Sequence, residues 1–112
     1  TGKNGEVLAL AYLTRNRFVI LHTNWRHSHY EIDIIAHRED ILHFIEVKTR
    51  RSLKFGYPEE SVTKKKLENL MNGAEAFLCQ NPQWKRIQYD ILSVNLWKNR
   101  DPEYFFIEDV YL

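Results

Sequence analysis

The chain has 112 residues, of which 44% are hydrophobic and 28% are charged, and its formal net charge is +1. This length and composition are typical of one globular domain, so we expect a single domain over residues 1–112 and exclude a disordered chain. Cys79 is the one cysteine, which excludes an internal disulfide and a zinc site built from several thiolates. The longest apolar run, Val7–Leu13, is too short to cross a bilayer, so we expect a cytoplasmic protein without a membrane partner.

The first half of the chain predicts one helix and three strands. Residues of roughly Glu6–Arg15 are good helix formers and are apolar on nearly every side, which indicates a buried helix. Arg17–Thr23 is rich in β-formers and predicts a first strand, followed by a polar loop over Asn24–His29. Tyr30–His37 and Ile41–Thr49 flank a short polar turn, a pattern typical of a β-hairpin.

The second half predicts a helix and two more strands. Apolar residues recur at helical spacing from Ser61 or Thr63 to Gln80, where Asn81-Pro82 ends the run. Gln88–Asn95 and Glu103–Leu112 then predict strands. A right-handed crossover would make the strands on either side of the second helix parallel. We therefore expect an α/β fold with a mixed β-sheet flanked by helices, in the order αβββαββ.

The predicted hairpin places two carboxylates opposite each other. A turn centred on Glu39 and Asp40 puts Asp33 across from Glu46, with Cβ atoms roughly 5 Å apart. Two like charges in that position destabilise a sheet unless a cation neutralises them. Oxygen ligands converging from two strands suit Mg²⁺ or Mn²⁺, with positions left for water and a substrate phosphate. The sequence therefore predicts a divalent metal site on this hairpin.

Alternation along the two strands predicts which side chains share a face. One face would carry Glu31, Asp33, Ile35, Phe44, Glu46 and Lys48, and the other Ile32, Ile34, Ile45 and Val47. Lys48 would then point toward the carboxylates, where an ammonium can steady an attacking water or a developing negative charge. The pattern leaves a structural alternative open, in which Glu31 and Lys48 form a cross-strand ion pair and the carboxylates lie at an exposed strand end.

Basic residues are concentrated in one segment of the chain. The segment from Lys48 to Lys66 contains seven basic and two acidic residues, so its formal charge is +5, and the rest of the chain has a formal charge of −4. The seven are Lys48, Arg50, Arg51, Lys54, Lys64, Lys65 and Lys66. Such a segment can hold phosphates, although a solvated loop and helix end would show the same composition.

Asp33 followed by Glu46-Val47-Lys48 resembles the PD-(D/E)xK nuclease signature. The sequence is more closely similar to the YraN family of small bacterial predicted endonucleases, over almost the whole chain. The motifs that carry this resemblance are Gly2-x-x-Gly5-Glu6-x-x-Ala9-x-x-Tyr12-Leu13, Asn24-Trp25-Arg26, Glu31-Ile32-Asp33-Ile34-Ile35-Ala36, Phe44-Ile45-Glu46-Val47-Lys48-Thr49-Arg50 and Val62-x-x-x-Lys66. The sequence departs from the family at Tyr30 and Arg17, where glycines are usual.

The resemblance implies a restriction-endonuclease-like core, related to that of archaeal Holliday junction resolvases. It implies Asp33 and Glu46 as metal ligands, Lys48 as the catalytic lysine and Glu6 as a helix-borne acid at the same Mg²⁺ or Mn²⁺. Val47 completes the implied set of metal ligands. From the residues alone, an acid such as Glu6 in a first helical turn is also favoured by the helix dipole, whatever the function.

The expected partner is DNA, and self-association into a homodimer is left open. The candidate nucleic-acid-binding residues are Arg26, Arg50, Lys64 and Lys66, of which Lys66 matches the family lysine. The leading hypothesis is a metal-dependent endonuclease that hydrolyses DNA phosphodiester bonds, with selectivity for branched DNA suggested by the resolvase resemblance. The alternative is a non-catalytic nucleic-acid-binding module on a nuclease fold.

Histidines are not expected to form a zinc site. His37 and His43 fall on opposite faces of the predicted hairpin, and His27 and His29 lie in a polar loop, so the four do not converge. Asp90 and Glu108 lie on the last predicted strands, and the sequence assigns no role to either residue.

Overall fold

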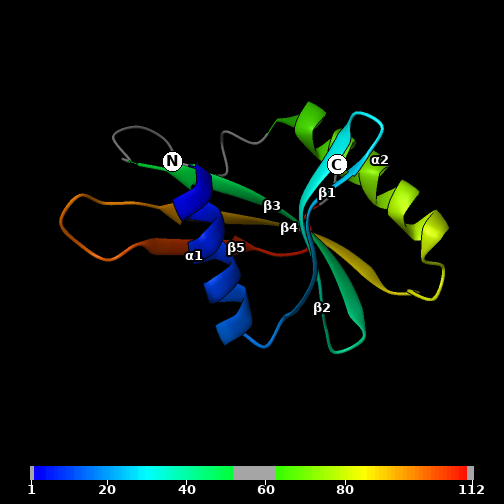
Figure 1. The fold of residues 1–112 in the computed structure, drawn as a ribbon, viewed down its shortest axis with the longest axis horizontal. Helices are drawn as coiled ribbons and strands as arrows, with labels where there is room; N and C mark the ends of the chain where they lie inside the picture. Colours follow the sequence, from blue (N-terminus) through cyan, green and yellow to red (C-terminus); the bar gives the residue numbers. More distant parts are fainter. Residues whose placement is uncertain (1, 52–62, 111–112) are drawn as a thin grey trace.

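A computed structural model describes residues 2–51 and 63–110 of the chain. Its two helices and five strands follow the order αβββαββ, which confirms the predicted fold class (Figure 1). The elements are α1 (Gly2–Arg15), β1 (Val19–His27), β2 (Tyr30–Arg38), β3 (Ile41–Arg50), α2 (Lys64–Gln80), β4 (Ile87–Asn95) and β5 (Glu103–Ile107). Of the residues singled out in the sequence, Lys54, Ser61 and Val62 lie outside the described residues.

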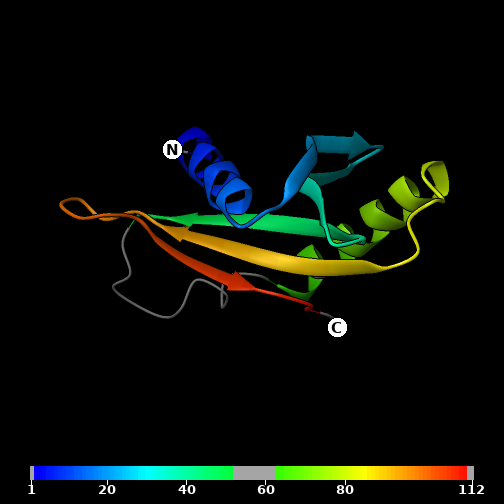
Figure 2. The same cartoon turned by 90° about the horizontal axis from the view of Figure 1, so that it is seen from below.

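The five strands form one mixed sheet in the order β1-β2-β3-β4-β5. β3 and β4 are parallel and the other neighbours are antiparallel, so the predicted parallel pairing of the strands on either side of α2 is confirmed. The two helices cover opposite faces of the sheet (Figure 2). One core packs α1 against residues such as Ile34 and Ile45, and the other packs α2 against residues such as Ile35 and Phe44.

The start of α1 lies unusually close to β3. A Cβ built on Gly5 would lie 2.0 Å from the Thr49 Oγ1 atom, a distance that no real contact allows, so this position requires glycine. The helix thereby holds its first turn against the end of β3. No helix among the described residues is long and apolar enough to cross a membrane.

The predicted polar loop at Asn24–His29 is wrong, because β1 continues to His27 and only Ser28 and His29 form the turn. The added half of β1 pairs with the first half of β2, with Trp25 opposite Ile32. Trp25 also packs edge-on against Phe77 of α2, at 5.3 Å between ring centroids. These tertiary contacts outweigh the polar composition that indicated a loop.

The predicted hairpin register is confirmed where the strands pair, from Ile34 with Ile45 to the turn at Glu39 and Asp40, but the pairing ends before Asp33 and Glu46. Both turn residues have positive φ, 53° and 67°, as a two-residue type I′ turn requires. The predicted faces need one correction. Ile32 packs with Ile35 in the core beneath α2, and not with Ile34. The reason is that β2 pairs with β3 only from Ile34 onward, whereas its first half pairs with β1 alone.

The start of α2 and the end of β5 are determined by specific hydrogen bonds. Thr63 caps α2, its side chain accepting a hydrogen bond from the Lys66 amide. The last strand was predicted to reach Leu112 but ends at Ile107. Asp109 has a φ of 59°, and its amide donates to the Asp90 carboxylate instead of continuing the strand ladder.

Candidate active site

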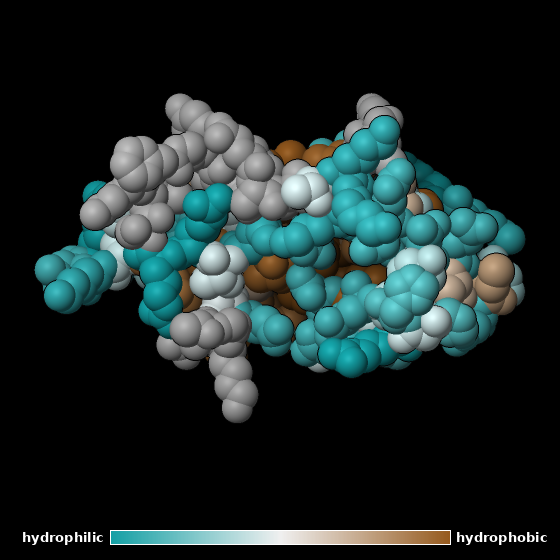
Figure 3. Space-filling view, turned by 90° about the horizontal axis from the view of Figure 1, so that it is seen from above, coloured by the Kyte–Doolittle hydropathy of each residue, from teal (hydrophilic) through white to brown (hydrophobic). Residues whose placement is uncertain are grey.

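Asp33 and Glu46 line one cavity of about 220 Å³ between the β2–β3 pair and α2. Its remaining lining residues are His29, Glu31, Lys66, Asn69 and Leu70. Both helices begin on the same side of the molecule (Figure 1). Seen from above, hydrophilic residues surround a central area in which hydrophobic residues are visible (Figure 3). The two carboxylates that the sequence placed opposite each other thus face the same space.

Asp33 lies where β2 and β3 separate. The Asp33 carboxylate accepts a hydrogen bond from the Val47 amide at 2.8 Å, just beyond the last paired residues, Ile34 and Ile45. Burial nevertheless raises the pKa of Asp33 above its ordinary value, although the Val47 hydrogen bond opposes that rise. The negative charges of Glu31 and Glu6 raise this pKa further. The hydrogen bond and positive charges around Asp33 therefore do not fully stabilise its ionised carboxylate.

Glu46 is perturbed more strongly. Burial, followed by the charge of Asp33, raises the pKa of Glu46 to about 7, and nearby Lys66 and Lys48 limit the rise. A partly buried carboxylate whose ionised form is disfavoured by a neighbouring carboxylate creates a demand for an additional cation. Because carboxylate oxygens are hard ligands, a small divalent ion such as Mg²⁺ or Mn²⁺ fits this pair.

Lys48 and Lys66 come from different elements but meet beside the carboxylates. Contact with Lys66, followed by burial, lowers the pKa of Lys48. The charge of Lys48 in turn lowers the pKa of both Asp33 and Glu46. Among the described residues Glu31 pairs with Arg26, at 3.4 Å, and not with Lys48, so the structure does not support the alternative cross-strand ion pair.

Glu6 is placed on the same side by the close approach of Gly5 to Thr49. The Glu6 carboxylate accepts a hydrogen bond from Asn24 at 3.4 Å and lies near enough to raise the pKa of Asp33. Within residues 2–51 and 63–110, Glu6, Asp33 and Glu46 do not form a group whose ligand atoms all lie within 4.8 Å of one another. The three carboxylates therefore do not all converge on one point in the described structure.

The other predicted site residues are spread around this centre. Val47 has an apolar side chain, so its backbone carbonyl is the one oxygen that it can offer to a metal. Arg50 contributes positive charge beside Lys48. Arg26 and Lys64 are exposed and do not line the cavity, so the structure brings Lys66 into the centre and leaves these two at its periphery.

A second group lies away from the predicted site and was missed by the sequence analysis. Ligand atoms of His43, Asp90 and Glu108 lie within 4.8 Å of one another, and this group could hold a metal ion. His43 and Asp90 are buried and joined by a hydrogen bond of 2.6 Å. Asp90 also accepts from Gln88 and from the Asp109 amide, so its oxygens already have partners.

The signal for this group is weak in the sequence because its residues are far apart. His43 and Asp90 are brought together by the parallel pairing of β3 and β4, and Glu108 by the segment that follows β5. The one signal in the sequence is the presence of two acids, Asp90 and Glu108, on the last predicted strands.

Comparison with known proteins identifies the family. The model of the family described as "Uncharacterised protein family UPF0102" matches residues 5–94. The chain belongs to the UPF0102 family. UPF0102 proteins of Chloroherpeton thalassium, Dictyoglomus thermophilum and Dictyoglomus turgidum are 36%, 41% and 44% identical to it. The alignments cover 98%, 88% and 85% of this chain and 92%, 84% and 81% of the relatives.

The family that the sequence motifs indicated is therefore confirmed, and the name UPF0102 states no activity. Membership of UPF0102, together with a group of side chains that could hold a metal ion, is compatible with an enzyme.

Proposed function

We propose that this UPF0102 protein is a metal-dependent endonuclease that hydrolyses DNA phosphodiester bonds. One observation carries the proposal: Asp33 and Glu46 line a single cavity, and burial together with neighbouring carboxylates raises the pKa of both. Ionised carboxylates in this environment destabilise the protein when no cation is bound to them. Acids with perturbed pKa values in a cavity are typical of functional sites. Their arrangement with Lys48 supports the resemblance to PD-(D/E)xK nucleases.

Asp33 and Glu46 would hold the cation, with Glu6 and the Val47 carbonyl completing its environment. A bound Mg²⁺ or Mn²⁺ would supply a polarised phosphoryl oxygen and a water of lowered pKa. The Val47 amide keeps one Asp33 oxygen oriented, which leaves the other oxygen for the cavity. The residues present therefore fit a divalent cation in donor type and in charge.

Lys48 and Lys66 would act on the phosphate itself. The two ammonium groups repel each other, which contributes to the lowered pKa of Lys48, and an anion bound between them would relieve that repulsion. Lys48 can then donate a hydrogen bond to negative charge as it develops in the transition state. Lys66, Arg50, Lys64 and Arg26 would hold neighbouring phosphates of the DNA.

A cleavage screen tests the proposal. Wild-type protein is incubated with Mg²⁺ or Mn²⁺ and linear, single-stranded, flap and four-way DNA, alongside Glu46→Gln and Lys48→Ala. We expect metal-dependent cleavage by the wild type alone. Lys48→Ala should keep Mn²⁺ binding but lose roughly 3–4 kcal/mol of transition-state stabilisation, whereas Glu46→Gln should lose the metal.

The same screen addresses substrate choice and the alternative. Preferential cutting of four-way or flap DNA would support selectivity for branched DNA. Wild-type protein that binds DNA but binds no divalent ion and cuts none of the substrates would overturn the nuclease proposal in favour of a non-catalytic binding module.

A further inference from the structure

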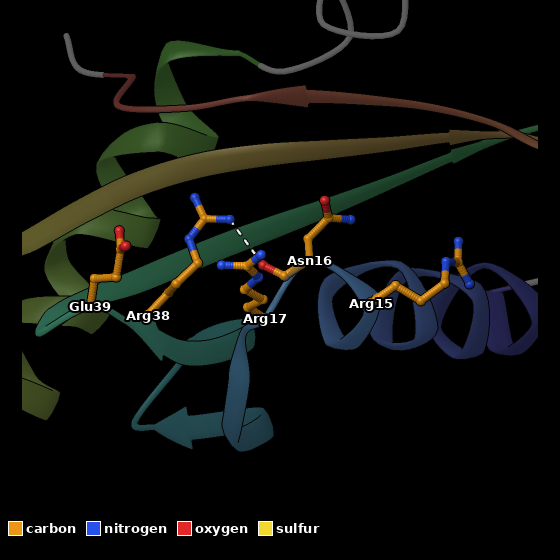
Figure 4. Close-up of a pocket in the computed structure, with 5 residues that line it drawn as sticks. All are labelled: Arg15, Asn16, Arg17, Arg38 and Glu39. Atoms are coloured by element: carbon orange, nitrogen blue, oxygen red, sulfur yellow. Dashed lines mark hydrogen bonds between the residues drawn. The ribbon is translucent and has the colours of Figure 1, made fainter.

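The far end of α1 carries a second cavity, which the proposed nuclease function does not use. It has a volume of about 570 Å³ and is lined by Arg15, Asn16, Arg17, Arg38 and Glu39 (Figure 4). Its residues lie at the end of α1 and just after it, and at the end of β2 and the start of the β2–β3 turn, whereas the candidate active site lies at the beginning of α1. Three guanidinium groups and one carboxylate give the lining an excess of positive charge.

Arg17 occupies a strained backbone position at this cavity. The Phe18 amide donates to the Leu13 carbonyl and the Arg17 amide to the Thr14 carbonyl, which is the hydrogen-bond pattern of a Schellman motif. Arg17 takes the left-handed position of that motif, with a φ of 71°. Glycine is usual there, because a Cβ is disfavoured in the left-handed region. A non-glycine residue kept in such a position is grounds for a functional hypothesis.

The Arg38 side chain, which lines the same cavity as Arg17, is fixed by three contacts. Its guanidinium stacks on the Phe18 ring at 4.1 Å and donates to the Asn16 carbonyl at 3.1 Å. It also meets the Glu108 carboxylate at 3.4 Å. Figure 4 shows the Arg38 side chain reaching the Asn16 carbonyl, while that of Arg15 extends along α1. Among the described residues, Arg15 and Arg17 form no ion pair.

We infer that this cavity binds a phosphoryl group, either from a nucleic-acid backbone or from a free phosphate. Guanidinium groups bind such oxygens through paired, charge-assisted hydrogen bonds. A phosphoryl group offers several oxygens to donors that approach from α1 and from β2, whereas a carboxylate offers two. The gain from this anion explains why Arg17 is kept where glycine would be less strained. The inference is independent of the proposed nuclease activity.

Titration with inorganic phosphate, followed by amide NMR shifts, tests the inference at constant ionic strength. The protein used carries Lys64→Ala and Lys66→Ala, so that phosphate binding near the candidate active site is weakened. Arg17→Gly and Arg17→Asn, which both tolerate the left-handed region, are compared with Arg100→Ala, an exposed arginine on another turn. A second arm replaces phosphate with a short single-stranded DNA.

We expect shifts centred on Arg17, Phe18 and Arg38, and binding about tenfold weaker in both Arg17 variants but unchanged in Arg100→Ala. Arg17→Gly should also raise the melting temperature in phosphate-free buffer, because it removes strain. Weakening in the DNA arm alone assigns the site to a nucleic-acid backbone, and weakening in both arms assigns it to phosphate in general. Equal binding by wild type and Arg17 variants in both arms overturns the inference, whatever the nuclease assay shows.

Discussion

The Val47 amide donates a hydrogen bond of 2.8 Å to the Asp33 carboxylate, just beyond the last paired positions of β2 and β3. Where the two strands separate, the Asp33 side chain thus takes the place of a backbone carbonyl of β2 as the acceptor for the Val47 amide. This relationship makes Asp33 a structural residue as well as a candidate metal ligand, and the two roles can be separated by substitution.

Asp33→Ala and Asp33→Asn should differ in stability. Alanine leaves the partly buried Val47 amide without its acceptor, which should lower the free energy of unfolding by about 1–3 kcal/mol. Asparagine keeps an acceptor oxygen and removes an uncompensated charge, so its stability should stay within about 1 kcal/mol of wild type. Urea denaturation measures both values. Equal destabilisation by the two substitutions would show that the charge of Asp33, and not its hydrogen bond, supports the hairpin.

Glu46 predicts a pH dependence of stability. The folded-state pKa of about 7 lies above the ordinary 4.5, so folding favours the protonated carboxyl. This contribution is complete below the unfolded pKa and is lost as the pH rises through 7. Glu46→Gln should therefore be more stable than wild type near pH 8 by about 2 kcal/mol, allowing for partial exposure of the side chain.

Chemical denaturation in chelator-treated buffer, at pH values near 4 and near 8, checks this sign. The difference between the two proteins should disappear at the acidic value. A wild-type protein that gains stability over Glu46→Gln as the pH rises would mean that Lys48 and Lys66 already compensate the carboxylate.

The hairpin could be predicted because its signals are local. Strict alternation and a two-residue turn determine the register of Ile34–Arg38 with Ile41–Ile45, beyond which Asp33 and Glu46 line the same cavity. The meeting of Lys48 with Lys66 depends on where α2 docks, and the His43, Asp90 and Glu108 group depends on the pairing of β3 with β4. Such contacts are not encoded in any short segment of sequence.

The error at Asn24–His29 has the opposite origin. Composition alone predicts a loop there, because most side chains of β1 face solvent. Pairing with β2 and the packing of Trp25 on Phe77 make the segment a strand. Local propensity fails where tertiary contacts provide most of the stabilisation.

Gly5→Ala should be strongly destabilising, because the new methyl group would overlap Thr49. We expect a loss of about 1–3 kcal/mol, as is typical of overpacking. Thr49→Ala in the same chain should recover part of that loss, since it removes the atom that would be closest. Gly73→Ala is the matched control in α2, because its methyl would meet neighbours at 3.2 Å or more. Thermal denaturation of the four proteins compares them.

A Gly5→Ala protein as stable as the Gly73→Ala control would mean that α1 can move away from β3. In that case the position of Glu6 beside Asp33 would not depend on Gly5.

Lys66 and Lys64 should make separable contributions to DNA binding. Removing a lysine that neutralises one phosphate should flatten the slope of log affinity against log salt by about 1. Lys66→Ala should also weaken nuclease activity, because Lys66 lies at the carboxylate cavity, whereas Lys64→Ala should affect binding alone. Fluorescence anisotropy at several salt concentrations measures the slope, with the exposed Lys98→Ala as control. Slopes unchanged in both variants would place the DNA surface elsewhere.

Two groups in the described structure compete as the metal centre, and isosteric substitutions distinguish them. Glu46→Gln removes a charged ligand from the cavity shared with Asp33, and Glu108→Gln removes one from the group with His43 and Asp90. We expect Mn²⁺ affinity to fall at least about tenfold in Glu46→Gln, because the raised pKa of Glu46 indicates a carboxylate that still lacks a cation. Glu108 already meets the Arg38 guanidinium at 3.4 Å, and Asp90 is occupied by three donors, so Glu108→Gln should bind Mn²⁺ as wild type does.

Calorimetric titration with Mn²⁺ measures both affinities, and the free energy of unfolding shows that each variant remains folded. Glu108→Gln should change that free energy by no more than about 1 kcal/mol, since it removes one partly exposed ion pair. Loss of Mn²⁺ binding in Glu108→Gln with retention in Glu46→Gln would move the metal centre to the buried histidine and separate it from Lys48. The carboxylate pair on the hairpin would then have no cation, and the chemistry proposed for it would fail.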